Sequence, residues 1–179
     1  NNPLDRVSYL RSNPEWIKKT IKKSDSTFVI FWRGKPFVST VSGLISGNSE
    51  PHQHSPGWFP LNFFEEKIIS ISSVIFLGLL DGKAYFSIDI SRVSDPDSEA
   101  GLKDLGKFED LMALSSQEIN PGELAMLGQA KSIFEWHKTH KYCSNCGAES
   151  TMVEAGYKRV CHNCNTEHFP RTDPVVIML

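Results

Sequence analysis

The pattern of hydrophobic and polar positions predicts a β-hairpin in the first quarter of the chain. Residues 27–33 form a dense run of β-branched and aromatic side chains, which are enriched in strands. Residues 34–35, Gly-Lys, then supply a turn, and residues 36–41 resume the hydrophobic pattern. Two such runs around a glycine-containing turn predict a pair of antiparallel strands.

A second hairpin is predicted further along, where the hydrophobic runs are longer. Residues 68–80 and 83–90 flank Asp81-Gly82, a dipeptide that suits a two-residue turn with positive φ. Between the two hairpins, residues 46–60 are polar and rich in Gly, Pro and Ser, so we expect a surface loop there.

Two further segments carry helix signals. Asn13 followed by Pro14 predicts a helix start, with Asn13 as the N-cap and Pro14 at the first helical position. Residues 103–114 are expected to be helical because four apolar side chains recur there at helical spacing. These are Leu105, Phe108, Leu111 and Met112.

The strongest helix signal begins at residue 120. Asn120 is expected to cap the helix, Pro121 enters its first turn, and Glu123 follows three residues after the cap. The helix is expected to end near Thr139. One stripe along it would consist of Leu124, Leu127, Ala130, Phe134 and His137. Strands followed by helices, without regular β–α–β alternation, predict an α+β domain over residues 1–136.

The composition is that of an ordinary globular protein. Of the 179 residues, 40% are hydrophobic and 22% are charged, and the net charge of −2 gives no overall attraction to nucleic acid or membranes. The acidic segment 61–136 and the mildly basic segment 1–60 are interpreted as solvated faces. No apolar run approaches the roughly 18 residues of a membrane span, and no secretory signal is recognised. We therefore expect a cytoplasmic protein with no membrane partner.

All four cysteines fall within one short window as two Cys-x-x-Cys pairs. Cys143 and Cys146 form the first pair, and Cys161 and Cys164 form the second. Each such turn lets two thiolates converge on one ion, and two turns complete a tetrahedron with zinc–sulfur distances of about 2.3 Å. The spacing predicts a structural zinc site, with residues 151–160 as the hairpin of a zinc ribbon. Four thiolates fill the coordination sphere, so no position is left for an activated water.

Alternatives to this ligand set exist. Two redox disulfides or unrelated free thiols are the main alternative, but the clustering of every cysteine at metal-ligand spacing favours zinc. Gly147, directly after the first pair, fits a turn that needs positive φ. His162 and His168 stand beside the cysteines and could replace a sulfur, although four sulfurs already suffice. His52 and His54 are interpreted as exposed loop residues.

Catalytic motifs are absent from the sequence. There is no Gly-rich phosphate loop, no Gly-x-Ser-x-Gly turn and no His-Glu-x-x-His helix. With every cysteine assigned to metal, no cysteine nucleophile is left. The adjacent acids Glu65-Glu66 and Glu109-Asp110 lack the further acids that a divalent-cation cluster needs. The residues alone therefore indicate a binding or scaffold fragment with a zinc ribbon.

A series of short motifs extends from the predicted ribbon to both of its flanks. The series consists of WH at residues 136–137, YCSNCG at 142–147, EAGYKRVCHNC at 154–164 and HFPRTDPVVIM at 168–178. Together these motifs closely resemble the NADH pyrophosphatase branch of the Nudix hydrolases, in which a zinc ribbon leads directly into such a strand. The start of the chain, NPLDR at residues 2–6, also resembles this family. The resemblance therefore covers the whole chain.

The resemblance implies a three-part enzyme. Residues 1–136 would form a rudimentary, non-catalytic Nudix-like domain, residues 137–172 the zinc ribbon, and residues 173–179 the first strand of a catalytic Nudix domain. Such enzymes hydrolyse the diphosphate of NADH or NAD to nicotinamide mononucleotide and AMP, and some members remove NAD caps from RNA. The family is usually homodimeric, which implies a homodimer here.

Catalysis in this family needs magnesium or manganese held by glutamates of the Nudix box, Gly-x5-Glu-x7-Arg-Glu-x2-Glu-Glu-x-Gly. No Arg-Glu dipeptide occurs among the 179 residues, so no catalytic residue is assigned. We expect that the chain stops at the first strand of a catalytic domain and that these residues alone are inactive. Without the metals, nothing lowers the pKa of the attacking water or neutralises the diphosphate.

Phe169 stands where family members carry an aromatic residue that helps to hold a base or the nicotinamide, which implies substrate binding by stacking. The alternative is that Phe169 packs the ribbon against the next domain. Lys158, Arg159 and Arg171 could contact phosphates or RNA, but a solvated face is the simpler interpretation. Two other classes of function remain open: a nucleic-acid-binding ribbon, which near-neutral charge disfavours, and a dimerisation scaffold.

Overall fold

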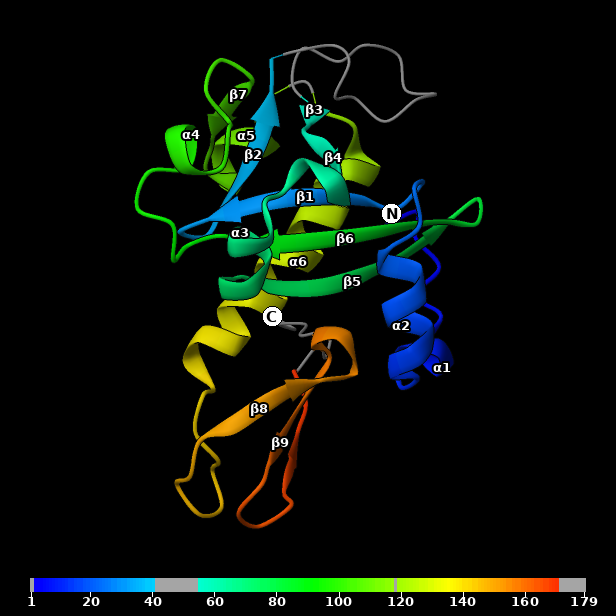
Figure 1. The fold of residues 1–179 in the computed structure, drawn as a ribbon, viewed down its shortest axis with the longest axis vertical. Helices are drawn as coiled ribbons and strands as arrows, with labels where there is room; N and C mark the ends of the chain where they lie inside the picture. The colour runs from blue at the N-terminus through cyan, green and yellow to red at the C-terminus, as the bar shows by residue number, and fades with distance from the viewer. Residues whose placement is uncertain (1, 41–54, 118, 171–179) are drawn as a thin grey trace, which may run out of the picture.

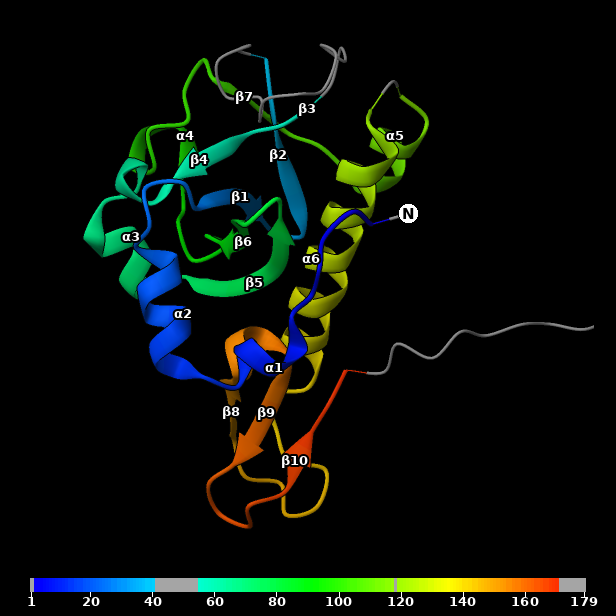
Figure 2. The same ribbon diagram turned by 90° about the vertical axis from the view of Figure 1, so that its right-hand side faces the viewer.

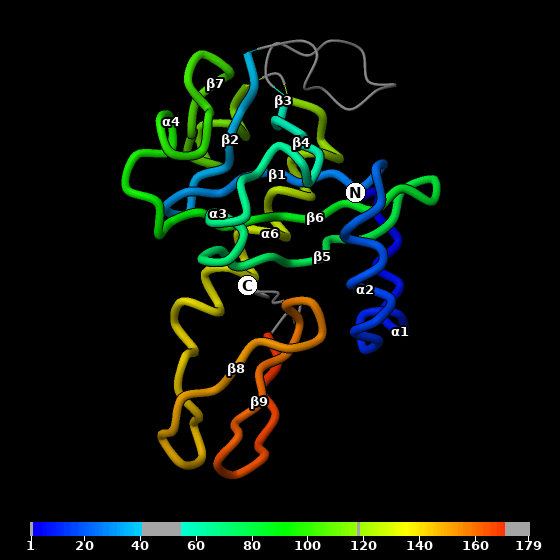
Figure 3. Tube along the Cα trace, viewed as in Figure 1, coloured from blue at the N-terminus to red at the C-terminus, as the bar shows by residue number. Residues whose placement is uncertain are grey.

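The structure is a computed structural model that describes residues 2–40, 55–117 and 119–170. Its strands form a seven-stranded sheet and a separate three-stranded sheet at opposite ends of the long axis (Figure 1; the same path is traced in Figure 3). The larger sheet contains β1 (Thr27–Trp32), β2 (Lys35–Ser39), β3 (Ser55–Pro56), β4 (Trp58–Pro60), β5 (Ser73–Leu80), β6 (Lys83–Asp89) and β7 (Gly106–Phe108). The smaller sheet contains β8 (Ser150–Val153), β9 (Lys158–Cys161) and β10 (Glu167–His168).

Helices surround the larger sheet and connect it to the smaller one. They are α1 (Ser8–Arg11), α2 (Pro14–Ile21), α3 (Glu66–Ile71), α4 (Pro96–Glu99), α5 (Leu111–Ser115) and α6 (Pro121–Thr139), with the 3-10 turns η2 (Leu61–Phe63) and η3 (Glu154–Gly156). This is a mixed α+β fold, as the sequence predicts. No described helix is both long enough and apolar enough to cross a membrane.

Both predicted hairpins form the centre of the larger sheet. Strands β1 and β2 pair antiparallel, and so do β5 and β6, while β1 and β6 run parallel in the middle. The turn between β5 and β6 has φ of 51° at Asp81 and 78° at Gly82, which confirms the positive-φ turn. The path through the sheet is β3-β2-β1-β6-β5, with β4 added to β1 and β7 added to β2.

The larger sheet is buried on both faces. Helix α6 covers one face, and α2 and α3 lie on the other (Figure 2). Successive residues of β1 alternate between the two cores: Val29 contributes to the core under α6, and Phe28 and Ile30 to the opposite core. A strand covered on both sides has no solvent-facing positions, which explains why residues 27–32 are hydrophobic almost throughout.

The predicted helix starts are confirmed. The Asn120 side chain accepts hydrogen bonds from the backbone N–H groups of Gly122 and Glu123, at 2.8 and 3.3 Å, and α6 ends at Thr139. The Asn13 side chain accepts from the backbone N–H of Trp16 at 3.1 Å. The predicted stripe of α6 is buried at Leu127, Ala130 and Phe134, and partly buried at Leu124 and His137.

The prediction of one strand over residues 68–80 is wrong in its first part. Helix α3 occupies Glu66–Ile71, and β5 begins only at Ser73. The Glu65 carbonyl accepts from the N–H groups of Ile68 and Ile69, which places Ile68 in the core. A short apolar run fits a buried helical turn as well as a strand, so periodicity could not separate the two.

The prediction of a helix over residues 103–114 is also wrong in part. Strand β7 occupies Gly106–Phe108 and pairs with β2, and α5 begins only at Leu111. Gly106 lies so close to β2 that a Cβ atom there would stand 2.0 Å from the Val38 carbonyl oxygen. The pairing with β2 therefore determines the structure of residues 106–108, although their apolar spacing is helical. Met112, which the sequence placed on the apolar stripe of that helix, is 78% exposed.

The prediction of a surface loop over residues 46–60 is wrong where the structure describes it. Residues 55–60 contain β3 and β4, and the side chains of Trp58 and Phe59 are buried. Phe59 pairs with Phe28 of β1, so these aromatic residues complete the core. Residues 46–54, with His52 and His54, lie outside the described residues, as do Arg171 and the predicted strand 173–179.

Candidate metal centre and the ribbon interface

The sulfur atoms of the four cysteines converge on one point. All four lie within 4.8 Å of one another, with 3.6 Å between Cys143 and Cys164 and 3.5 Å between Cys146 and Cys161. Disulfide sulfurs stand about 2.05 Å apart. A tetrahedral zinc with bonds of about 2.3 Å requires sulfur–sulfur separations of about 3.8 Å. The observed distances therefore fit four ligands of one ion and do not fit two disulfides.

Two equivalent backbone turns present the cysteines. In the first turn the N–H of Gly147 donates to the Cys143 carbonyl at 2.9 Å, and in the second the N–H of Asn165 donates to the Cys161 carbonyl at 2.8 Å. Gly147 has φ of 75° and Asn165 has φ of 57°. Glycine and asparagine are the residues that adopt this conformation most readily. The sequence analysis identified Gly147 but missed Asn165, although both stand four residues after the first cysteine of their pair.

Polar groups around two of the sulfurs favour their thiolate form. Thr166 Oγ1 lies 3.1 Å from the Cys164 sulfur, and the Thr166 side-chain and backbone hydrogen bonds lower the pKa of Cys164 to about 5. Hydrogen bonding from Asn163 also lowers the pKa of Cys146. The pKa of Cys161 is affected by opposing contacts. A backbone hydrogen bond from Cys164 lowers it, but burial and the contact with Cys146 outweigh that effect and raise the pKa to about 11. A bound cation would favour the thiolate form of the cysteines that hold it.

The two histidines near the cysteines have different surroundings. His168 Nε2 lies 3.3 Å from the Cys143 sulfur, close enough for a hydrogen bond to a ligand. His162 Nε2 lies 2.7 Å from the Thr151 hydroxyl across the β8–β9 hairpin. Neither belongs to the group of four converging sulfurs.

The tip of the β8–β9 hairpin rests on the larger sheet. Gly156 of η3 has φ of 105°, and a Cβ atom there would stand 2.5 Å from the Ile75 side chain of β5. Tyr157 packs against the core under α6, its hydroxyl bonds to the side chain of Gln129, and the Arg11 guanidinium lies 3.7 Å from the centre of its ring. Only tertiary packing unites these residues, so no sequence pattern could have identified the contact.

A second junction joins the C-terminal half of α6 to the ribbon. His137 Nε2 lies 2.7 Å from the Gly156 carbonyl oxygen, and His137 Nδ1 lies 3.1 Å from the Arg159 guanidinium. A neutral ring with its proton on Nε2 satisfies both contacts. Burial, together with the charge of Arg159, lowers the pKa of His137 to about 4. Arg159 is only 7% exposed, and its desolvation lowers its own pKa.

Phe169, the predicted substrate-binding residue, follows β10 and is 58% exposed. It lines a cavity of about 250 Å³ that it shares with Arg6, Arg11, Gln129 and Tyr157. The Lys158 ammonium group lies 5.8 Å from the centre of its ring. Lys158 itself forms ion pairs with Glu154 and Glu167, at 2.9 and 2.6 Å.

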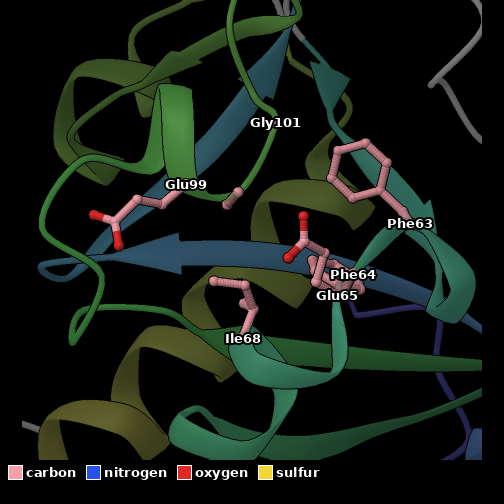
Figure 4. A pocket seen from close by; sticks show the side chains of 7 residues that line it. Phe63, Phe64, Glu65, Ile68, Glu99 and Gly101 are labelled. Carbon is pink, nitrogen blue, oxygen red and sulfur yellow. The ribbon is translucent and has the colours of Figure 1, made fainter.

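Glu65, one of the acidic residues noted in the sequence, does not belong to the group of converging cysteines. Glu65 and Glu99 line a small cavity of about 100 Å³ beside Phe63 and Phe64 (Figure 4). Glu65 pairs with the neighbouring Lys67, and Glu99 accepts hydrogen bonds from backbone N–H groups. Across residues 2–40, 55–117 and 119–170, the four cysteines are the only group of three or more ligand-type side chains close enough to hold one ion.

Comparison with known protein families matches both parts of the chain. Residues 25–136 match the model described as the NADH pyrophosphatase-like rudimentary NUDIX domain, and residues 138–169 match the NADH pyrophosphatase zinc ribbon domain. The first match ends at residue 136 and the second begins at residue 138, both within the last turn of α6, the helix that connects the larger sheet to the ribbon.

Curated relatives point in the same direction. Nudix hydrolase 19, chloroplastic, of Arabidopsis thaliana is 30% identical over 83% of this chain and 36% of its own length. The human NAD-capped RNA hydrolase NUDT12 is 25% identical over 98% of the chain and 44% of its length, and the Saccharomyces cerevisiae NAD-capped RNA hydrolase NPY1 is 26% identical over 98% and 56%. The chain thus spans about a third to just over half of these relatives. It belongs to the family of proteins with an NADH pyrophosphatase-like rudimentary NUDIX domain and an NADH pyrophosphatase zinc ribbon.

Proposed function

We propose that Cys143, Cys146, Cys161 and Cys164 bind one structural zinc ion. The convergence of their four sulfur atoms is the observation that carries this proposal. Four thiolates saturate a tetrahedral ion, so the zinc fixes the ribbon and does not activate water. Because the ligands must stay reduced, we place the protein in a reducing compartment such as the cytoplasm.

We further propose that the chain is the non-catalytic front part of a hydrolase that cleaves the diphosphate of NAD(H). Its products would be nicotinamide mononucleotide and AMP, and RNA with an NAD cap is a second substrate of the same chemistry. The family match and the relatives named NAD-capped RNA hydrolases support this proposal. The parts would be residues 1–136, the ribbon 137–172, and 173–179 as the first strand of a catalytic Nudix domain.

The chemistry of diphosphate cleavage assigns the catalysis to residues outside these 179. Magnesium or manganese would lower the pKa of the attacking water and neutralise the diphosphate, and a Nudix box would hold them. The sequence contains no Arg-Glu dipeptide and therefore no Nudix box. The 179 residues alone are thus inactive toward NADH. Homodimer formation, usual in the family, is part of the proposal.

The ribbon would act as a rigid connection between the rudimentary domain and the catalytic one. Contacts of its tip with Ile75, Gln129 and His137 support this role, because they attach the ribbon to both β5 and α6. A fixed ribbon would also hold Phe169 in a constant position. Exposed on the ribbon next to two arginines, Phe169 would stack on a base or on the nicotinamide of the substrate.

A comparison of two proteins tests the proposed activity. The purified chain should release no AMP from NADH with magnesium or manganese, whereas the complete gene product should do so. Within the complete product, Phe169→Ala should raise KM by about tenfold or more, since base stacking contributes about 1–3 kcal/mol. Phe169→Tyr keeps a flat ring and should keep KM near the wild-type value. Turnover by the 179-residue chain would refute the assignment of catalysis to residues outside it.

Two alternative functions have distinguishable outcomes. A dimerisation scaffold predicts a dimer in sedimentation measurements and no NADH hydrolysis by the complete gene product. A nucleic-acid-binding ribbon predicts salt-dependent RNA affinity, again with no NADH hydrolysis by the complete gene product. Hydrolysis of NADH by the complete product would exclude both as the sole function.

A further inference from the structure

A cleft of about 500 Å³ lies where the larger sheet, α6 and the ribbon meet. Its walls come from the ends of β1 and β6 and the start of β5, from the C-terminal half of α6, and from the segments around β8 and β9. Figure 1 shows α6 extending below the sheet toward the ribbon. The cleft is separate from the cysteine cluster and from the cavity beside Phe169.

Basic side chains predominate in the cleft, although the chain as a whole is slightly acidic. Six cations line it: Arg33, Arg92, Lys131, Lys138, Lys141 and Arg159. Three acids do so as well: Asp89, Glu135 and Glu149. The local excess of positive charge attracts anions despite the net charge of the chain.

Two of these cations form salt bridges with carboxylates, and four do not form one with any described residue. Lys131 lies 3.9 Å from Asp110, and Lys138 lies 3.6 Å from Glu135. The other four, which we call the open cations, are Arg33, Arg92, Lys141 and Arg159. Within the described part of the chain, none of the four forms a salt bridge. Arg33, Arg92 and Lys141 are exposed, so a ligand can reach them.

Arg159 distinguishes this cleft from an ordinary solvated face. It is 93% buried, and its hydrogen-bond partners are all neutral: the Ser150 hydroxyl at 2.8 Å, the His137 ring, and the carbonyls of Lys141 and Ser150. The charge of Glu149 also acts on Arg159, although among the described residues no ion pair joins the two. Burial of a cation with so little compensation is costly, and an anion entering the cleft would offset part of that cost.

Two of the three acids in the cleft are engaged by other groups. Asp89 accepts hydrogen bonds from the backbone N–H and the hydroxyl of Ser91, and Glu135 is paired with Lys138. Glu149 is exposed. Among these carboxylates, Glu149 competes with an incoming anion because its charge acts on Arg159. Asp89 and Glu135 compete less, since other groups already engage them.

We propose that this cleft binds the phosphate backbone of single-stranded RNA. The inference rests on the proposed function, which makes RNA with an NAD cap a substrate. It assigns the body of that RNA to a cleft whose lining shares no residue with the cavity beside Phe169. Cations distributed over a strand end, a loop and the ribbon suit a chain of phosphates better than one compact phosphate group. Contacts of this kind position RNA without reading its sequence.

Binding to phosphates has a characteristic dependence on salt. For single strands, log K falls with log salt concentration with a slope of about −0.7 per phosphate neutralised. Four open cations thus predict a slope of about −3 for a short RNA. The removal of one exposed cation should reduce the slope by about 0.7 and weaken binding several-fold at low salt.

Fluorescence anisotropy with the zinc-loaded chain tests this proposal. The probe is an uncapped, labelled single-stranded RNA of twelve nucleotides, titrated between about 50 and 200 mM salt, so that only the RNA body is probed. Arg92→Gln and Lys141→Gln should each weaken binding about threefold or more, and the double variant about tenfold. Lys19→Gln removes the same charge from α2, outside the cleft, and should change affinity less than twofold.

The outcomes separate the proposal from its alternatives. No RNA binding at 50 mM salt, or equal losses in the cleft variants and Lys19→Gln, would overturn it. Inorganic pyrophosphate serves as a second probe, and tighter binding of pyrophosphate than of RNA in the cleft would overturn the choice of RNA. NADH hydrolysis by the complete gene product should be unchanged in both cleft variants. Failure of that hydrolysis with intact RNA binding would reject the proposed function and leave the cleft site standing as an RNA site.

Discussion

His137, two residues before the end of α6, donates a hydrogen bond from Nε2 to the carbonyl oxygen of Gly156, 2.7 Å away at the tip of the ribbon hairpin. The ribbon is thus attached to the rest of the molecule at two places, by the chain after α6 and by its own tip. Gly156 also contacts Ile75 of β5, so the tip touches helix and sheet together. This attachment makes the orientation of the ribbon sensitive to single side chains.

The protonation of His137 should make stability depend on pH. The ring has a pKa of about 4 in the folded protein, because burial disfavours its charged form, and a pKa of about 6.5 when unfolded. Between these values the unfolded chain binds a proton that the folded chain does not. The free energy of unfolding should therefore decrease as the pH falls from about 6.5 toward 4, by roughly 1–2 kcal/mol after allowance for partial exposure.

Chemical denaturation at several pH values measures this effect. Acid also weakens zinc binding, so the informative quantity is the difference between the wild type and His137→Gln, which share the same cysteines. Glutamine can still donate to the Gly156 carbonyl but does not titrate. The wild type should lose more stability than the variant between pH 6.5 and 4. If the free energy of unfolding changed equally with pH in the two proteins, the prediction would be contradicted.

Gly156 should not tolerate a side chain. Gly156→Ala introduces a Cβ atom 2.5 Å from the Ile75 side chain, at a residue with φ of 105°. We expect a loss of about 1–3 kcal/mol in the free energy of unfolding. The matched control is Gly128→Ala in α6, where a Cβ atom meets nothing within 4 Å, and it should stabilise the protein by up to about 1 kcal/mol. Equal changes at the two positions would show that the tip is not docked as described.

The hydroxyl of Tyr157 should contribute measurably to the attachment. Tyr157→Phe removes its hydrogen bond with Gln129 and keeps the ring on which Arg11 stacks. The expected loss is about 0.5–1.5 kcal/mol. Tyr142→Phe, at a ribbon residue that is 69% exposed, makes the same chemical change and should alter stability by less than about 0.5 kcal/mol. Thermal unfolding of the zinc-loaded variants Tyr157→Phe and Tyr142→Phe measures both changes in stability.

The parts of the fold that the sequence predicts correctly are those with local causes. Asn120 caps α6 through its own side chain, and Asp81-Gly82 adopts the turn conformation that these residues favour. The two Cys-x-x-Cys turns, which end at Gly147 and Asn165, are also local, whereas the pairing of β8 with β9 brings the two turns together. Such features depend on a few neighbouring residues, so a sequence pattern is enough to find them.

The parts that the sequence analysis misses depend on contacts between distant residues. Gly106 belongs to a strand because β2 lies beside it, although the spacing of its neighbours is helical. Arg159 was interpreted as part of a solvated face, whereas the structure buries it between His137 and Ser150. The docking of Tyr157 on Gln129 likewise joins residues 28 positions apart. No local pattern encodes these pairs.

Removal of zinc should unfold the ribbon and leave the larger sheet intact. The ribbon sheet consists of strands of four, four and two residues, too small to be stable without a cross-link. Zinc contributes about 10–16 kcal/mol to the folding of comparable zinc-finger peptides. Elemental analysis should find one zinc per chain. After chelation, hydrogen exchange should become fast at the amides of Ser150 and Cys161, while those of Val29 and Phe86 stay protected.

The same experiment connects the metal to the proposed RNA cleft. Lys141 and Arg159 belong to the ribbon, whereas Arg33 and Arg92 belong to the larger sheet and its loops. Chelation should therefore remove two of the four open cations from the cleft and reduce the salt slope of RNA binding from about −3 to about −1.4. Cys164→Ser should have the same effect, and Ser144→Ala, between the first two cysteines, should have none. Unchanged amide protection and an unchanged slope after chelation would mean that the ribbon folds without metal.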